Sequence, residues 1–343
     1  MTAAILLVWL APMQSRVPLG GISPASLAAS GEKLLEAQRT REAREAFQGA
    51  LQLEPANFAA LSGMGFIDFS EGRFAPARIW LEKAVQSRHK SFQARFLLGA
   101  TLVELNDSTG AIGQLSVAHR LNPEHADARK LLAAQYSNTR QYKQAIALLA
   151  PVVDRVPYDE ETHLLLIGAR QASGDSAGVF ALATRAARRF PRSPQVAAWL
   201  GFQLQFSGRY QEAEKELRKA IEIDPLFGVS YQLLGEVCLK REDYADAVSW
   251  FRKAAGRMPQ DMETLMGLGR ALAAMGDTAA GLEALRSAAR VAPENAQVHL
   301  QLSRLYFRIG DEEKARQEAD LSVKLRSSAP DGMEAPAALR AVK

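Results

Sequence analysis

Residues 194–225 read PQVAAWLGFQLQFSGRYQEAEKELRKAIEIDP, and this stretch predicts two short helices joined by a tight turn. Ser193 followed by Pro194 favours a helix start, because the serine oxygen can accept from an early backbone amide and proline at the first helical position loses no hydrogen bond. We expect the first helix to run to about Phe206. Ser207-Gly208 then ends it, since glycine readily adopts the left-handed conformation that closes a helix.

The second half of the stretch predicts an amphipathic helix that begins near Tyr210. Ala213, Leu217, Ala220 and Ile221 follow at spacings of four, three and one, which places them on one face. Asp224-Pro225 ends the helix, because a residue before proline is pushed out of the helical region. The whole stretch is therefore predicted to form a helical hairpin with one buried face.

The same pattern recurs along the chain with a period of 34 residues. Prolines mark its ends at Pro55, Pro123, Pro157, Pro191, Pro225, Pro259 and Pro293, with a first interval of 68 and later intervals of 34. A glycine lies twenty-four residues before the end in most units, at Gly31, Gly65, Gly99, Gly201, Gly235 and Gly269. Such regular spacing indicates a repeat array. We place nine units at starts 24, 58, 92, 126, 160, 194, 228, 262 and 296, spanning 24–329, with an N-terminal extension or signal segment at 1–23 and a flexible tail at 330–343.

The composition supports a helical chain and excludes several classes of site. Alanine and leucine far outnumber valine and isoleucine, so helix formers dominate the 343 residues. The 42 basic and 38 acidic residues leave a formal net charge of only +4, which by itself indicates no nucleic-acid partner. The single cysteine, Cys238, excludes an intramolecular disulfide and a zinc site built from cysteines.

The repeated positions resemble those of the tetratricopeptide repeat. In the sixth unit the resemblance is carried by Trp199-Leu200-Gly201, Gly208-Arg209-Tyr210, Ala213, Leu217, Ala220 and Pro225, and the seventh unit repeats most of them. The resemblance implies an all-α fold, an α-solenoid with a right-handed superhelix. In that fold the first helices line a concave groove and the second helices form the convex side.

Some units depart from the pattern. Pro151 falls inside the second helix of the fourth unit, where it removes a backbone hydrogen bond. The fifth unit has Ile167 in the glycine column and Val179 in an alanine column. We therefore expect the chain between residues 145 and 185 to be kinked or less regular, as a hinge or as local repacking. The last unit carries charges along its second helix, which predicts an outer face that can meet water.

The residues that could support catalysis do not form a convincing site. His119 and His125 lack the spacing of a metal pair, and His163 beside Glu160 and Glu161 is expected to be part of a capping or solvated cluster. Cys238 is expected to be a buried, inert thiol. We therefore predict no enzyme activity, no cofactor and no metal site. The basic group Arg185, Arg188, Arg189 and Arg192 is expected on a solvated convex face, with a phosphate or nucleic-acid patch as the alternative.

The groove is the better candidate for a site. Positions two, five, nine, twelve and thirteen of each unit face the groove by resemblance to the family, and aromatic rings beside amides suit a peptide ligand. The alternative is that several of these rings pack between adjacent helices. The groove candidates are Phe66, Phe69, Phe96, Val103, Gln195, Phe202, Gln205, Phe206, Gln232, Glu236 and Lys240.

Two ligand classes of the family are excluded by absent residues. The clamp for acidic chaperone tails needs lysines and asparagines in three consecutive units, and here Lys130 is followed by Ala134, Leu165 and Gln195. The asparagine ladder of glycosyltransferase-type arrays is also missing, because Leu97, Leu131, Leu165 and Trp199 occupy its positions.

We therefore expect a non-enzymatic adaptor that binds a protein or peptide of unknown identity. The alternatives are a nucleic-acid-binding helical array and a regulatory subunit that activates a partner enzyme. The apolar run Ala3–Ala11 is too short for a transmembrane anchor, and it lacks the preceding basic residues of an export signal. An exported, periplasmic location and a cytoplasmic one both stay open.

Overall fold

The computed structural model describes residues 23–155 and 159–327, and all regular structure in these ranges is α-helical. The chain divides into two compact units, residues 1–158 and 159–343. Unit 1 contains α2 (Pro24–Glu36), α3 (Thr40–Leu53), α4 (Phe58–Ser70), α5 (Phe74–Ser87), α6 (Phe92–Glu104), α7 (Ser108–Leu121), α8 (Ala126–Asn138) and α9 (Tyr142–Leu149). Unit 2 contains α10 (Glu160–Ala172), α11 (Ser176–Arg189), α12 (Pro194–Phe206), α13 (Tyr210–Ile223), α14 (Gly228–Lys240), α15 (Tyr244–Ala255), α16 (Met262–Met275), α17 (Thr278–Val291), α18 (Ala296–Arg308) and α19 (Glu312–Ser327).

The helical hairpin predicted for residues 194–225 is confirmed in α12 and α13. The Ser193 side chain accepts a hydrogen bond from the Val196 amide at 3.0 Å and so caps α12. Gly208 has a φ of +72°, the left-handed conformation that the turn requires. Along α13 the alanines and the leucine of the predicted face are fully buried, and the opposite face is solvated.

Glycines in the first helices allow the two helices of a pair to pack closely. A Cβ atom added at Gly201 would lie 2.6 Å from Cγ of Leu217, and one added at Gly65 would lie 2.6 Å from Cγ of Leu81. Real Cβ atoms do not approach other atoms so closely, so a larger residue would push the helices apart. The glycine column of the sequence is therefore the seam along which the hairpins that carry it close.

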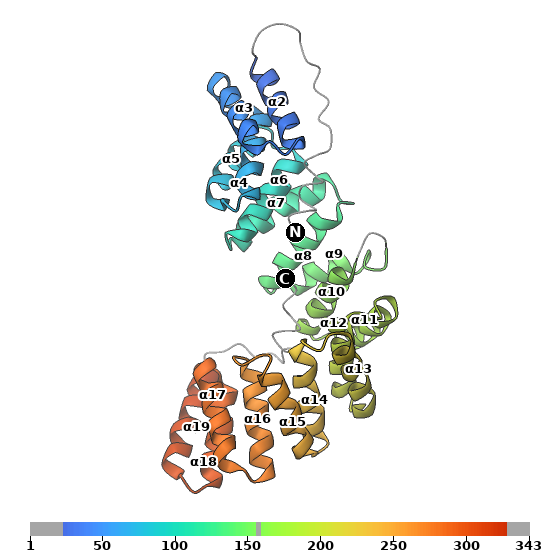
Figure 1. Ribbon diagram of the computed structural model, residues 1–343, viewed down its shortest axis with the longest axis vertical. Helices are drawn as coiled ribbons and strands as arrows, with labels where there is room; N and C mark the ends of the chain where they lie inside the picture. Colours follow the sequence, from blue (N-terminus) through green and yellow to red (C-terminus); the bar gives the residue numbers. More distant parts are fainter. Residues whose placement is uncertain (1–22, 156–158, 328–343) are drawn as a thin grey trace. The chain divides into compact units, whose positions relative to one another are not determined.

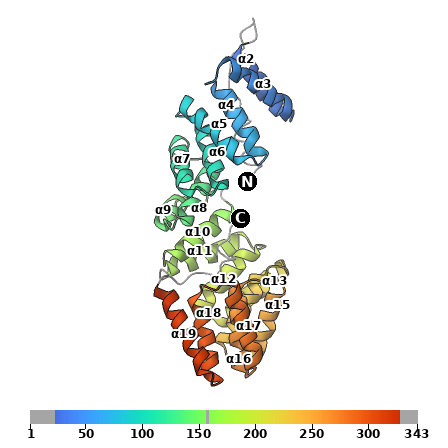
Figure 2. The ribbon, with the colours of Figure 1, turned by 90° about the vertical axis from the view of Figure 1, so that its left-hand side faces the viewer.

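The two helices of a hairpin have different surroundings within each unit. Consecutive first helices contact each other directly, as α4 and α6 do in unit 1 and α14 and α16 do in unit 2. Each second helix other than α9 and α19, the last ones of their units, packs against first helices on both sides. Figure 1 and Figure 2 show the hairpins stacked side by side within each unit. Because the first helices lie closest together, they form the inner layer of each stack, and α12 and α14 are buried over most of their length.

The predicted irregularity is confirmed at the end of unit 1. α9 has 8 residues, whereas the other second helices have 12 to 16, and it ends at Leu149, two residues before Pro151. The turn that follows still buries Val152 and Val153. Ile167 and Val179 are also buried, and they do not interrupt α10 or α11.

The prediction that the outer face of the last second helix meets water is confirmed, because α19 is rich in charged residues and is exposed over most of its length. Val323 on α19 and Phe307 on the preceding helix α18 are also exposed, at 69% and 72%. Ser322 is buried, and its hydroxyl donates to the Ala296 carbonyl at 2.8 Å. The cap therefore keeps apolar side chains at its surface. No helix among the described residues is long and apolar enough to cross a bilayer, while Ala3–Ala11 and the tail 330–343 lie outside the described residues.

Candidate partner-binding site

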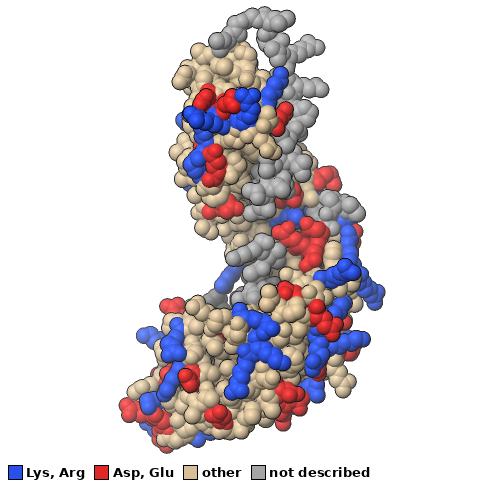
Figure 3. Space-filling model, viewed as in Figure 1, with Lys and Arg blue, Asp and Glu red and all other residues tan. Residues whose placement is uncertain are grey.

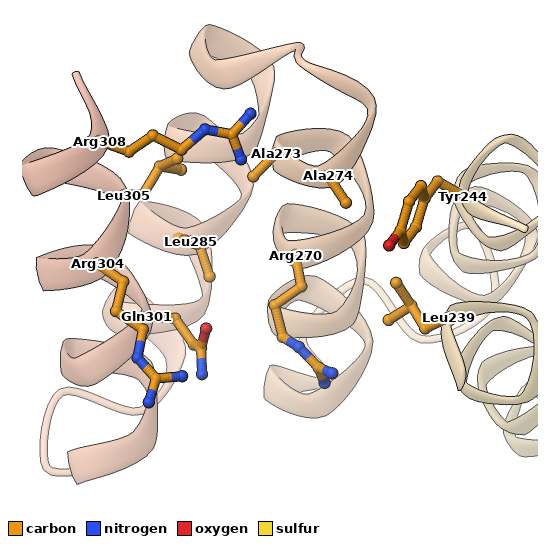
Figure 4. A pocket seen from close by; sticks show the side chains of 10 residues that line it. All are labelled: Leu239, Tyr244, Arg270, Ala273, Ala274, Leu285, Gln301, Arg304, Leu305 and Arg308. Carbon is orange, nitrogen blue, oxygen red and sulfur yellow. The ribbon is translucent and has the colours of Figure 1, made fainter. Parts of the chain in front are cut away.

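A pocket of about 350 Å³ opens on the inner side of unit 2. Its walls come from three consecutive first helices, α14, α16 and α18, with one residue each from α15 and α17. Figure 4 shows the lining residues, which are Leu239, Tyr244, Arg270, Ala273, Ala274, Leu285, Gln301, Arg304, Leu305 and Arg308.

The repeat geometry explains why these residues meet. Arg270 and Arg304 are 34 residues apart and occupy the same position of neighbouring helical repeats, so stacking of the hairpins places both on the inner layer. Arg308 follows Arg304 by one helical turn and therefore lies on the same face of α18. The pocket is thus a direct product of stacked first helices that carry arginine at matching positions.

The three arginines differ in their pairing. Nη1 of Arg270 lies 3.3 Å from Oε1 and 3.5 Å from Oε2 of Glu236, across α14 and α16. Arg304 and Arg308 form no ion pair with the described part of the chain. Figure 3 shows lysine and arginine side chains in several groups on one face of unit 2, with acidic side chains between them. Relative to that mixed surface, the pocket has an excess of positive charge.

Figure 4 shows how the polar groups are distributed in the pocket. The guanidinium of Arg304 lies beside the amide of Gln301, and both point to the same end of the pocket as the guanidinium of Arg270. The guanidinium of Arg308 lies at the other end and reaches toward Ala273. The pocket therefore presents hydrogen-bond donors at two separated places.

The groove residues predicted from the sequence differ in their accessibility. Four candidates belong to unit 1 and seven to unit 2. The buried candidates are Phe66, Phe69, Phe96, Phe202 and Gln232. The half-buried ones are Val103, Gln195, Gln205 and Glu236, while Phe206 and Lys240 are exposed.

Several of the buried rings pack against other rings. Phe69 meets Phe74 edge-on with centroids 5.5 Å apart, and Phe96 stacks on Phe92 at 5.7 Å. Phe202 contacts Phe206 at 5.1 Å, and Phe206 is 52% exposed. A ligand on the inner side would therefore reach Phe206 and the half-buried side chains more readily than the buried phenylalanines.

Sequence reasoning named Glu236 and Lys240 next to the pocket, but it missed the arginines. Arg270 and Arg304 occupy position nine of the eighth and ninth units, and Arg308 occupies position thirteen. These are positions that the family resemblance assigns to the groove. Applying the same positions to the last two units would have found all three.

The other reactive groups have structural surroundings. Cys238 is buried, and burial raises the pKa of its thiol to about 11, so the reactive thiolate is disfavoured. His163 is fully buried, with Nδ1 3.0 Å from the carbonyl oxygen of Asp159, the N-cap of α10, and its ring edge-on to Phe190. Of the two alternatives, the solvated cluster was therefore wrong, and the contact to the N-cap residue agrees with a capping role. Among the described residues no group of three or more His, Cys, Asp and Glu could hold a metal ion.

The basic group of the fifth unit lies on the outer side of its hairpin. Arg185, Arg188 and Arg189 belong to the second helix α11 and are exposed, as is Arg192 in the turn that follows. The guanidinium of Arg189 lies 5.7 Å from the ring centroid of Phe190. The group is therefore placed on the solvated face that the sequence predicts.

Comparison with known proteins agrees with the fold. Residues 34–100, 203–261 and 266–330 match families described as tetratricopeptide repeat, and residues 70–152 match the family described as anaphase-promoting complex, cyclosome, subunit 3. A crystal structure of a tetratricopeptide repeat protein from Parabacteroides merdae superposes with a TM-score of 0.51 at 19% identity, covering 69% of this chain and 94% of that one. The structure of the anaphase-promoting complex hetero-tetramer Cut9-Hcn1 gives a TM-score of 0.49 at 14% identity, covering 90% of this chain and 82% of that one.

One curated relative matches over most of the chain. The chain is 25% identical over 282 residues to the protein CTR9 homolog of Arabidopsis thaliana, an alignment that includes 78% of this chain and 26% of the relative. The chain thus spans about a quarter of the length of that relative.

The stacked helix pairs, the glycine seams and the inner layer of first helices define an all-α solenoid of helical repeats. Within that class, the chain belongs to the tetratricopeptide repeat family.

Proposed function

We propose that this protein is a non-enzymatic scaffold that binds a protein or peptide partner on the inner side of unit 2. The observation that carries the proposal is the pocket formed by α14, α16 and α18, in which Arg304 and Arg308 have no ion-pair partner among the described residues. Three helical hairpins of unit 2 contribute to this one cavity, so a ligand there would contact several repeats at once. Half-buried Gln205 and exposed Phe206 on α12, and exposed Lys240 on α14, offer further polar and aromatic groups on first helices of unit 2.

Partner binding is tested by photo-crosslinking in the cells that make the protein. A photoreactive residue at Gln301 probes the pocket, and the same residue at Glu283, exposed on the second helix α17, is the matched control. We expect a discrete protein adduct from position 301 and a much weaker one from position 283. Equal adducts at both positions, or an adduct removed by nuclease, would contradict the proposal.

A further inference from the structure

The pocket of unit 2 has a charge pattern that selects among peptide ligands. Arg270 already holds one carboxylate, that of Glu236. Arg304 and Arg308 hold none, so three guanidinium groups face one internal carboxylate and leave two positive charges uncompensated. Arginine pairs well with carboxylates because its planar fork donates two hydrogen bonds in parallel.

The remaining donors of the pocket are also available. The amide of Gln301 and the hydroxyl of Tyr244 have no hydrogen bond to the described part of the chain. Gln301 lies beside the guanidinium of Arg304 (Figure 4), so one carboxylate could accept from both side chains. That end of the pocket is suited to an oxyanion.

Apolar side chains occupy the space between the charged ends. Leu285, Leu305, Ala273 and Ala274 line the pocket, and Leu305 lies between Arg304 and Arg308 along α18. A ligand with charge along its entire length would leave this apolar surface without a partner. A ligand with an apolar side chain between two acidic groups would match it.

The spacing of the arginines agrees with a short extended peptide. The Cα atoms of Arg304 and Arg308, four residues apart, are separated by about 6 Å along the helix axis. Residues i, i+2 and i+4 of an extended chain point to the same side, and the outer two lie about 13 Å apart. Because the two guanidinium groups point to opposite ends of the pocket (Figure 4), they reach well beyond the spacing of their Cα atoms and suit that outer pair.

We propose that the pocket binds an extended acidic segment of the partner protein, with acidic residues two positions before and two positions after an apolar residue, one carboxylate at the Arg304 and Gln301 end and the other at Arg308. This inference rests on the proposed function and adds the chemistry of the ligand. A nucleic acid fits less well, because its backbone is charged throughout and Tyr244 is the only aromatic residue lining the pocket, whereas single strands stack on successive rings.

The first test measures peptide binding to the full chain by fluorescence anisotropy. The probe is a labelled dodecapeptide with a central Glu-Ser-Leu-Ser-Glu between Gly-Ser spacers, and a Gln-Ser-Leu-Ser-Gln peptide is its neutral control. We expect the acidic peptide to bind more tightly, and the double variant Arg304→Gln/Arg308→Gln to weaken its binding by about tenfold or more. Arg252→Gln, a single arginine-to-glutamine change at an exposed position of α15, should leave binding within about twofold. Equal binding of the two peptides, or equal loss in both variants, would overturn the proposal.

A second variant gives an effect of the opposite sign, which misfolding does not explain. Glu236→Gln removes the internal carboxylate that occupies Arg270 and repels an acidic ligand. We expect this variant to bind the acidic peptide about two- to fivefold more tightly at low salt, with the gain reduced as salt increases. Unchanged or weaker binding would show that the arginine pocket does not receive the carboxylates.

Selection from a random dodecapeptide library separates the inference from the proposed function. Enriched acidic peptides that fail to bind the double arginine variant support both. Enriched peptides without acidic residues, blocked by substitution of Gln301 with a bulky residue, overturn the acidic ligand and keep the scaffold. A library that yields no pocket-dependent peptide contradicts both, and an oligonucleotide whose binding is lost in the double variant overturns the peptide ligand.

Discussion

A single turn position after each first helix controls how the hairpins close. In all nine helical repeats the residue at this position has a positive φ, between 58° and 96°, and five of these residues are glycine. The other four are Gln38, Asn106, Arg140 and Glu242. A side chain in the left-handed region costs about 1–2 kcal/mol relative to the right-handed one, so four turns carry strain that glycine would avoid.

The strain predicts a stabilising substitution. Glu242 is exposed, has no ion pair with the described residues, and has a φ of 64°. Glu242→Gly should raise the free energy of unfolding by about 0.5–1 kcal/mol, since the relief of strain exceeds the greater chain entropy of glycine in the unfolded state. Chemical denaturation measures the change. Glu242→Ala removes the same side chain without relieving the strain, and an equal gain from alanine would contradict the explanation.

A histidine cap predicts that acid destabilises unit 1. Nδ1 of His125 accepts from the Ala128 amide at 3.1 Å, and the ring lies 4.8 Å from Phe92 and 5.1 Å from Phe96. Burial lowers the pKa of His125 below its ordinary 6.5, and burial followed by the charge of Arg129 lowers the pKa of His119. The unfolded chain therefore binds protons more readily than the folded one.

This difference fixes the sign of the pH dependence. The stabilisation is fully present above pH 6.5 and is lost as the pH falls from there through the lowered pKa values of the folded state. We expect the urea concentration at which half of unit 1 is unfolded to be lower at pH 5 than at pH 7.5. His125→Asn keeps a capping acceptor that does not titrate, so it should reduce the change of the unfolding free energy with pH. Adding His119→Gln should reduce this pH dependence further. If the His125→Asn/His119→Gln double variant showed the same pH dependence of unfolding as the unmodified protein, these two histidines would not be its source.

At the scale of the helices, small residues set how closely the pairs approach. Ala220 on α13 is fully buried, and the next first helix, α14, packs against α13. Ala220→Leu should lower the free energy of unfolding by about 1–3 kcal/mol, because the added methyl groups force packed helices apart. Glu222→Leu on the exposed side of α13 is the matched control, with a change of at most about 0.5 kcal/mol in urea unfolding. Similar values for the two variants would contradict close packing at this seam.

At the scale of the whole molecule, each unit has a hydrophobic core of its own. Phe47, Leu81 and Leu115 are fully buried in unit 1, and Leu217, Phe251 and Leu285 are buried in unit 2. In a repeat protein each hairpin is stabilised mainly by its immediate neighbours. The stability of either unit should therefore come largely from its own hairpins.

The separate cores predict that the two units fold independently. We expect residues 24–155 and residues 159–327, produced separately, to give helical circular dichroism spectra and cooperative urea unfolding. Hydrogen exchange on the full chain provides the reference, since protected amides in α4 or α14 should stay protected in the corresponding fragment. A fragment without a cooperative transition would show that its core is incomplete.

The sequence alone was sufficient for the helix pairs and their closest contacts. Those features depend on neighbours within about 34 residues: Ser193 caps its own helix, Gly201 faces Leu217 in its own hairpin, and Pro151 ends α9 near its own position. The binding candidates were predicted less well, because whether a ring such as Phe96 or Phe202 is reachable depends on how neighbouring hairpins cover it. Only the stacking of three hairpins brings Arg270, Arg304 and Arg308 to one pocket while Glu236 pairs with just one of them. Local hydrogen bonds and short-range packing are encoded in adjacent residues, whereas exposure and charge balance arise from side chains that meet only after the chain has folded.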